Sequence, residues 1–174
     1  MILVQLPYFL KFQRKLDLVM NNERILYASK LILENVNTLS FSAKNLTSFP
    51  DIVKDGNVDI SCVTSIDLKK NRLTHGLFKL VPFTELRRLN IGDNYFTDLD
   101  FAESETKLEQ LHAFANRIDV FGENLVTKLK NLTILNLNRN FIEKLPSNIN
   151  LLENLQKLSL KECFSNFFKT MVDD

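Results

Sequence analysis

The residues best suited to catalysis or metal binding are few and widely spaced in this chain of 174 residues. His75 and His112 are its two histidines, and Cys62 and Cys163 are its two cysteines. None belongs to an H-E-x-x-H, C-x-x-C or G-x-S-x-G motif, which would bring a metal ligand or a nucleophile together with its partners. The four glycines are too scattered for a loop that cradles phosphate. The sequence therefore predicts a protein that is not an enzyme and that uses no cofactor and no metal.

The regular feature of the chain is a repeated pattern of leucine and asparagine. It is most complete in residues 132–152, LTILNLNRNFIEKLPSNINLL. The first half alternates apolar with other residues, which is the period of a strand with one buried face. The second half has the spacing of a turn followed by an irregular or helical return. The pattern recurs at steps of 23, 27, 23, 22, 24 and 23 residues, starting near Leu16, Leu39, Ile66, Leu89, Leu111, Leu135 and Leu158.

This pattern resembles the leucine-rich-repeat family, whose consensus is L-x-x-L-x-L-x-x-N-x-L in units of about 20–29 residues. The resemblance implies an α/β solenoid. A curved parallel β-sheet would line its concave face, and helical or irregular segments would form the convex side. The Leu145-Pro146 and Phe49-Pro50 steps are similar to the cytosolic Ras-group type with 22–24-residue repeats. That type implies a scaffold that regulates a signalling GTPase or a phosphatase.

We expect a single domain over residues 1–174, with about six to seven repeats in residues 16–163. Residues 1–15 are too apolar for a free tail and predict an N-terminal cap, because the first layer of a repeat array needs a cover. Residues 164–174 predict a C-terminal capping helix, since apolar residues recur there with helical spacing. The one step of 27 residues places an insertion in residues 51–61.

The asparagine of each repeat has a structural explanation. The chain turns sharply after the strand, and a buried amide offers donors and an acceptor to the backbone of adjacent turns. Leaving such backbone groups unpaired costs about 1–3 kcal/mol each. We expect a ladder of this kind at Asn71, Asn94, Asn116 and Asn140. Cys163 is a substitute that the family accepts at this position, whereas Lys44 predicts either a local bulge or a side chain that extends to water.

The residues that alternate with the buried leucines would form the concave face. We predict that a protein partner binds there, through Arg88, Asn90, Gln110, His112, Phe114, Ile134, Asn136 and Asn138. An exposed aromatic ring surrounded by polar residues has the composition of an interface hot spot. The alternative is that Phe114 folds into the gap at Gly92, since single exposed apolar side chains are common.

The charge balance argues against a general polyanion binder. The chain has 22 basic and 21 acidic residues, a net charge of +1, so we expect no nucleic-acid partner. Two alternatives remain open. Lys69, Lys70, Arg72, Arg87 and Arg88 could form a basic patch for a nuclear or RNA-processing partner, although a solvated mixed-charge surface explains them more simply. The chain could also be the recognition part of a longer leucine-rich-repeat enzyme. The acidic residues around Asp100 predict a solvated loop.

The N-terminus and the cysteines bear on the compartment. The first residues lack the features of a signal peptide, and no apolar stretch approaches the ~18 residues of a membrane span. Cys62 and Cys163 lie four turns apart, which is roughly 20 Å at ~4.8 Å per strand, too far for a disulfide. Free thiols favour a reducing compartment. We therefore expect a monomer in the cytoplasm, with the nucleus as an alternative location.

Overall fold

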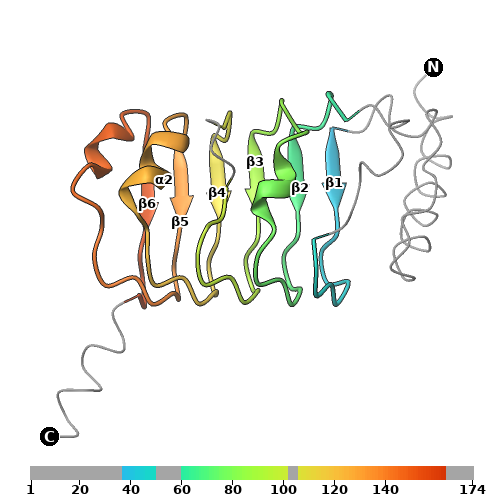
Figure 1. Cartoon of the computed structure of the whole chain (residues 1–174), viewed down its shortest axis with the longest axis horizontal. Coiled ribbons are helices and arrows are strands. Elements are labelled where there is room, and N and C mark those ends of the chain that lie inside the picture. Colours follow the sequence, from blue (N-terminus) through green and yellow to red (C-terminus); the bar gives the residue numbers. More distant parts are fainter. Residues whose placement is uncertain (1–36, 50–59, 102–105, 164–174) are drawn as a thin grey trace, which may run out of the picture.

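The repeated pattern folds into one parallel sheet (Figure 1). The computed structural model describes residues 37–49, 60–101 and 106–163, and six strands follow one another across the sheet in sequence order. Each strand is three residues long, because only the centre of each repeat is extended. The strands are β1 (Thr38–Ser40), β2 (Ser65–Asp67), β3 (Arg88–Asn90), β4 (Gln110–His112), β5 (Ile134–Asn136) and β6 (Lys157–Ser159).

The strands pair in the register that the repeat predicts. Leu39 lies opposite Ile66, and Leu89, Leu111, Leu135 and Leu158 continue the same row. These six residues are the predicted starts of the second to seventh repeats. The first repeat at Leu16, the N-terminal cap and the C-terminal helix lie outside the described residues, as does most of the insertion.

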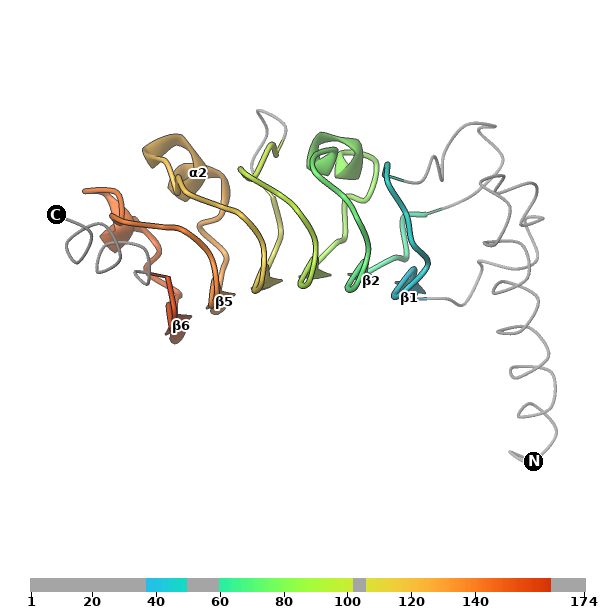
Figure 2. The ribbon, with the colours of Figure 1, turned by 90° about the horizontal axis from the view of Figure 1, so that it is seen from below.

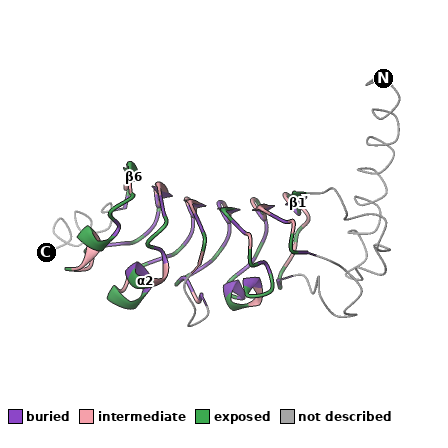
Figure 3. Cartoon of the chain, turned by 90° about the horizontal axis from the view of Figure 1, so that it is seen from above, coloured by how far each residue is buried: buried purple, intermediate pink, exposed green. Residues whose placement is uncertain are grey.

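The sheet lines the concave side of a curved solenoid (Figures 2 and 3). Short helices lie on the opposite side: the 3-10 helices η1 (Leu77–Leu80) and η2 (Ile149–Leu151), and the α-helix α2 (Glu123–Lys128). The α/β solenoid predicted from the repeat is confirmed. Within the described ranges, no helix is long and apolar enough to cross a membrane.

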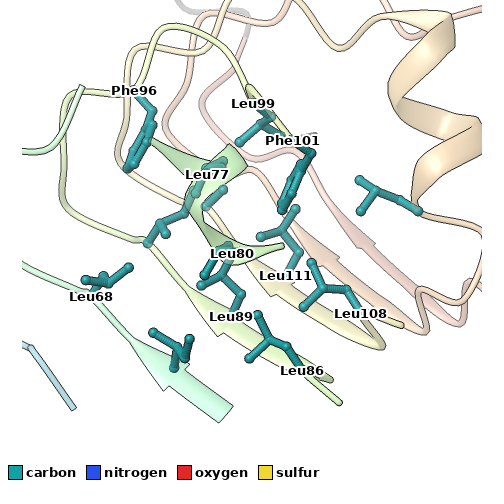
Figure 4. Close-up of a cluster of buried hydrophobic side chains, with 14 of the residues drawn as sticks. Leu68, Leu77, Leu80, Leu86, Leu89, Phe96, Leu99, Phe101, Leu108 and Leu111 are labelled. Carbon is teal, nitrogen blue, oxygen red and sulfur yellow. The ribbon is translucent and has the colours of Figure 1, made fainter. Parts of the chain in front are cut away.

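A continuous apolar core fills the space between the sheet and the convex segments (Figure 4). Leu89, Leu111 and Leu135 are fully buried, whereas Leu158 in the last described strand is 38% exposed. The inward leucines of the central strands are covered on both sides by neighbouring turns, as expected for stability that comes largely from nearest neighbours.

The turn after each strand passes through a left-handed residue. Lys70, Asp93, Ala115, Arg139 and Glu162 have φ between 51° and 60°. This conformation costs a non-glycine residue roughly 1–2 kcal/mol. Each of these residues directly precedes a ladder position, so the hydrogen bonds of the ladder offset the strain.

Candidate protein-binding face

The parallel register places the predicted partner-binding residues in rows across neighbouring strands. Arg88, Gln110 and Ile134 are adjacent in one row, and Asn90, His112 and Asn136 are adjacent in the next. Arg88 is exposed and the other five are half-buried. The structure therefore brings together residues that lie 22 to 24 positions apart in the sequence, on a sheet whose backbone is fixed by hydrogen bonds.

The asparagines of this face use one side-chain atom for local structure. Asn90 Oδ1 accepts a hydrogen bond from the Gly92 N–H at 3.1 Å, and Asn136 Oδ1 accepts one from the Asn138 N–H at 3.2 Å. Asn138 Oδ1 in turn accepts from the Lys161 N–H at 2.7 Å. Among the described residues, the three Nδ2 groups have no hydrogen-bond partner. Each asparagine therefore leaves the two N–H donors of its amide for a partner. The sequence alone did not show that the amide oxygen is already bonded.

Phe114 packs against the sheet instead of projecting from it. A Cβ atom placed on Gly92 would lie only 2.4 Å from Cε1 of Phe114, so the ring rests on the Gly92 backbone. The Lys69 ammonium lies 5.1 Å from the ring centroid and 3.7 Å from the Asp93 carboxylate. The second interpretation of Phe114, that it fills the gap at Gly92, agrees with this geometry. Its half-buried ring also orients Lys69 by a cation–π contact.

His112 lies near the centre of the face and is half-buried. Burial lowers the pKa of its imidazole, and the positive charge of Lys157 lowers that pKa further. Both effects favour the neutral ring, because burial and a nearby cation each disfavour the imidazolium. The neutral ring can donate one hydrogen bond and accept another. It gives the face an acceptor beside the amide donors of Asn90 and Asn136.

The asparagine ladder lies in the turns that follow these strands, and its four asparagines are buried. Asn94 Nδ2 donates to the carbonyl oxygens of Leu68 and Ile91, both at 3.0 Å. Its Oδ1 accepts from the Leu73 N–H at 3.0 Å. The Nδ2 groups of Asn71, Asn116 and Asn140 reach the same two carbonyl positions of their own and the preceding turn. The ladder therefore joins consecutive turns and holds the strand ends in register.

The two substitutions in the ladder have different consequences. Cys163 is buried, and its Sγ donates to the Leu137 carbonyl at 3.0 Å, so it replaces the bond to the preceding turn. At Lys44 the backbone N–H donates to Asn71 Oδ1 at 3.0 Å. Asn45 next to it has a φ of 57°, a second left-handed residue in that turn. This agrees with the local bulge predicted at Lys44.

Comparison with known proteins agrees with the repeat pattern and the fold. The MAP kinase phosphatase with leucine-rich repeats protein 3 of Dictyostelium discoideum is 28% identical over 141 residues, which is 78% of this chain and 16% of that protein. Internalin C2 of Listeria monocytogenes superposes with a TM-score of 0.60 at 28% identity, over 75% of this chain and 54% of that one. No family model matches the chain. The chain is a leucine-rich-repeat protein.

The leucine-rich-repeat chain spans only a small part of its curated relatives. The leucine-rich repeat serine/threonine-protein kinase 1 of Mus musculus is 27% identical over 120 residues, which is 66% of this chain and 6% of that kinase. The names of the kinase and the phosphatase describe those whole proteins. The similarity shared with this chain supports a protein-interaction module.

The basic residues singled out in the sequence do not form one patch. Arg88 lies opposite Ser65, and Lys69 follows Ser65 by four residues, which separates the two along the strand by about 13 Å. Arg87 is ion-paired with Glu109 and with Glu85. The repeat thus divides the basic residues between the two ends of the strands. They do not form the contiguous basic surface that a nucleic-acid partner would need.

An acidic residue that the sequence assigned to a solvated loop has a structural role. The Asp100 carboxylate accepts hydrogen bonds from the Gly76 N–H at 2.9 Å and from the Leu77 N–H at 3.0 Å. It therefore satisfies backbone donors at the start of η1 from the following turn. The expectation for Asp100 was wrong, because the repeat spacing of 24 residues from Gly76 brings it there and no local motif indicates it.

Neither a metal site nor an enclosed catalytic cavity is evident in the part of the leucine-rich-repeat chain that the structure describes. No group of three or more His, Cys, Asp or Glu side chains could hold a metal ion within residues 37–49, 60–101 and 106–163. A cavity of about 390 Å³ lies on the convex side between η1 and the next turn. Its lining is largely apolar and includes Phe101 and Thr106, which border the undescribed residues 102–105. We place no site there. Neither Cys62 nor Cys163 forms a disulfide within the described residues.

Proposed function

We propose that this leucine-rich-repeat chain binds a protein partner across the concave face of β3, β4 and β5, without catalysing a reaction. The observation that carries the proposal is the row of Asn90, His112 and Asn136 on three adjacent strands. Their free donors and the neutral imidazole stand on a sheet that is already rigid. A preformed surface loses little conformational entropy on binding.

The apolar part of the contact would come from Ile134. It is half-buried beside Gln110 in the first row and offers aliphatic surface between polar neighbours. Arg88 stands at the exposed end of the same row. This combination of an apolar centre with a polar rim is typical of protein interfaces.

The concave face can be tested with a double variant on that face and a double variant on another surface. We expect Arg88→Glu with Asn136→Lys to reduce partner recovery in affinity capture, and to weaken binding of the recovered partner by roughly tenfold or more. The control is Asn124→Lys with Thr127→Glu, on exposed positions of α2. Quantitative mass spectrometry and titration provide the measurements. If both variants keep the same partners at wild-type affinity while folded, the concave face is not the binding site.

We further propose that the partner belongs to a signalling system, a GTPase or a phosphatase, and that binding takes place in the cytoplasm. The Ras-group type of repeat supports this, as do the two cysteines, which form no disulfide within the described residues. Fractionation of the native source with thiol labelling of Cys62 tests the location: recovery only in an oxidising compartment would contradict it. Light scattering of the purified chain tests the proposed monomer.

A second candidate function has its own support. The chain corresponds to 16% of one relative and 6% of another, whose names include a phosphatase and a kinase. The chain would then be the recognition part of a longer enzyme. Sequencing the transcript beyond the codon for Asp174 distinguishes the two: a continuing frame that encodes a catalytic domain favours this second candidate.

A further inference from the structure

A second surface lies along the edge where the strands end, outside the concave face. The residue that follows each ladder asparagine is either an arginine or an aromatic residue: Arg72, Tyr95, Arg117 and Phe141. We call these four residues the arginine–aromatic edge. All four are exposed, with Tyr95 at 41% and Phe141 at 43%. The turns that carry them run side by side along one edge of the solenoid (Figure 1).

Backbone hydrogen bonds fix the spacing of this edge. The Tyr95 N–H donates to the Leu73 carbonyl at 2.8 Å, and the Arg117 N–H to the Phe96 carbonyl at 2.8 Å. The Phe141 N–H donates to the Ile118 carbonyl at the same distance. The four residues therefore occupy consecutive turns, about 4.8 Å apart. The Arg117 guanidinium lies 4.7 Å from the centroid of the Tyr95 ring, so these side chains stack along the edge.

Neither arginine of this edge forms an ion pair within the described part of the chain. No carboxylate there lies within ion-pair distance of Arg72 or Arg117. At the other end of the strands, by contrast, Arg87 and Lys107 share the carboxylates of Glu85 and Glu109. The arginine–aromatic edge thus presents two cations and two apolar rings in alternation, which complements a ligand with alternating acidic and apolar groups.

The spacing selects the form of that ligand. Four positions about 4.8 Å apart span ~14.4 Å, and residues i, i+3, i+7 and i+10 of an α-helix lie at ~0, 4.5, 10.5 and 15 Å along its axis. Side chains on one face of an extended strand recur every ~6.8 Å, so four of them span ~20 Å and lose register. A helix therefore matches the edge over its whole length, and an extended peptide does not.

We propose that the arginine–aromatic edge docks an acidic amphipathic α-helix of a partner protein. Carboxylates at i and i+7 would contact Arg72 and Arg117, and apolar side chains at i+3 and i+10 would contact Tyr95 and Phe141. A single-stranded nucleic acid fits less well. Asp93, Asp119 and Glu143 belong to the same turns, and would repel a ligand that carries a phosphate at every nucleotide.

The test uses a fluorescein-labelled helical peptide with Glu at i and i+7 and Leu at i+3 and i+10, in an alanine and glutamine background. Its control peptide has Lys in place of both Glu residues. Fluorescence anisotropy is measured with the full chain and with the variant Arg72→Glu plus Arg117→Glu. A matched variant, Lys107→Glu plus Lys130→Glu, makes the same charge change at exposed positions outside the edge and the concave face. Circular dichroism confirms that each variant is folded.

We expect the acidic peptide to bind wild type and the matched variant equally, and to lose roughly tenfold or more in affinity with the edge variant. The Lys peptide should show the reverse preference, because the charges have been exchanged. Tyr95→Ala plus Phe141→Ala should also weaken the acidic peptide. Absence of binding, or equal binding to wild type and edge variant, overturns the proposal. Binding of a twelve-residue oligouridylate in place of the peptide, lost in the edge variant, overturns it in favour of nucleic acid. We expect the concave-face variant, Arg88→Glu with Asn136→Lys, to bind the acidic peptide with wild-type affinity.

Discussion

Asn94 and Asn90 lie four residues apart in the same turn, yet the solenoid gives them opposite roles. Asn94 is 4% exposed, and its amide bonds to the backbone of its own turn and of the preceding turn. Asn90 is half-buried on the concave face and forms one local hydrogen bond, to the Gly92 N–H. The same side chain thus stabilises the fold in one position and is left for recognition in the other. Position within the repeat, and not residue type, decides between the two.

The strongest test of this comparison replaces each asparagine by alanine. We expect Asn94→Ala to lower the free energy of unfolding by roughly 2–5 kcal/mol, because it leaves buried backbone groups of two turns unpaired. Asn90→Ala should cost less than about 1 kcal/mol, since its site reaches solvent. Urea unfolding followed by circular dichroism measures both. Equal losses of unfolding free energy would show that the hydrogen bonds of the ladder do not make Asn94 more important for stability than Asn90.

A second test concerns the boundary between the inward and outward positions, at Gly92. The Gly92→Ala methyl group would meet the Phe114 ring, so we expect a loss of about 1–3 kcal/mol from overpacking. Removing the ring as well should relieve the clash. The double variant Gly92→Ala plus Phe114→Ala should then be more stable than the sum of the single losses predicts, by about 0.5–3 kcal/mol.

Thermal and urea unfolding of the two single variants and the double variant complete this cycle. Additive losses would mean that the ring moves away freely and that Phe114 is available to a partner after all. That outcome would restore Phe114 as a candidate hot spot on the concave face.

The smallest expected effect is a pH dependence from His112. Its pKa in the folded chain is lowered by burial and by Lys157, so the unfolded chain binds the proton more readily. Stability contributed by the neutral ring is therefore complete above the unfolded pKa of about 6.5. It is lost progressively as the pH falls toward the lower folded pKa. His112→Gln should remove this part of the acid destabilisation.

Unfolding midpoints at about pH 7.5, 6.5 and 5.5 provide the measurement, with His75→Gln as the control because His75 is exposed. The difference between the two variants isolates His112 from the carboxylates that titrate in the same range. If His112→Gln keeps the pH dependence of the wild type, the His112 imidazole is not its source.

The predictable part of the molecule is the part that repeats. Six of the seven predicted repeat starts are strand centres in register, and Asn71, Asn94, Asn116 and Asn140 are all buried. These follow from the sequence because each turn needs an apolar strand face and a donor for its unpaired carbonyls. The predicted domain boundaries and caps stay predictions, since they depend on residues outside the described ranges.

The candidate sites were less predictable, because they depend on contacts between turns. The sequence identified Asn90, His112 and Asn136 as outward-facing, but not which of their atoms are already bonded. It also left open whether the Phe114 ring projects or rests on Gly92. It assigned Asp100 to solvent, although that carboxylate caps η1 from the next turn.

The sequence by itself determined the solenoid, its register and the division of residues between core and surface, since each follows from a period of 22 to 27 residues. Only the tertiary structure decided which side chains of neighbouring repeats are in contact. It stacked Arg117 on Tyr95, set Lys69 over Phe114 and separated Arg88 from Lys69. The physical reason is that side-chain contacts between turns depend on rotamers and local backbone shape, which a repeat spacing does not specify.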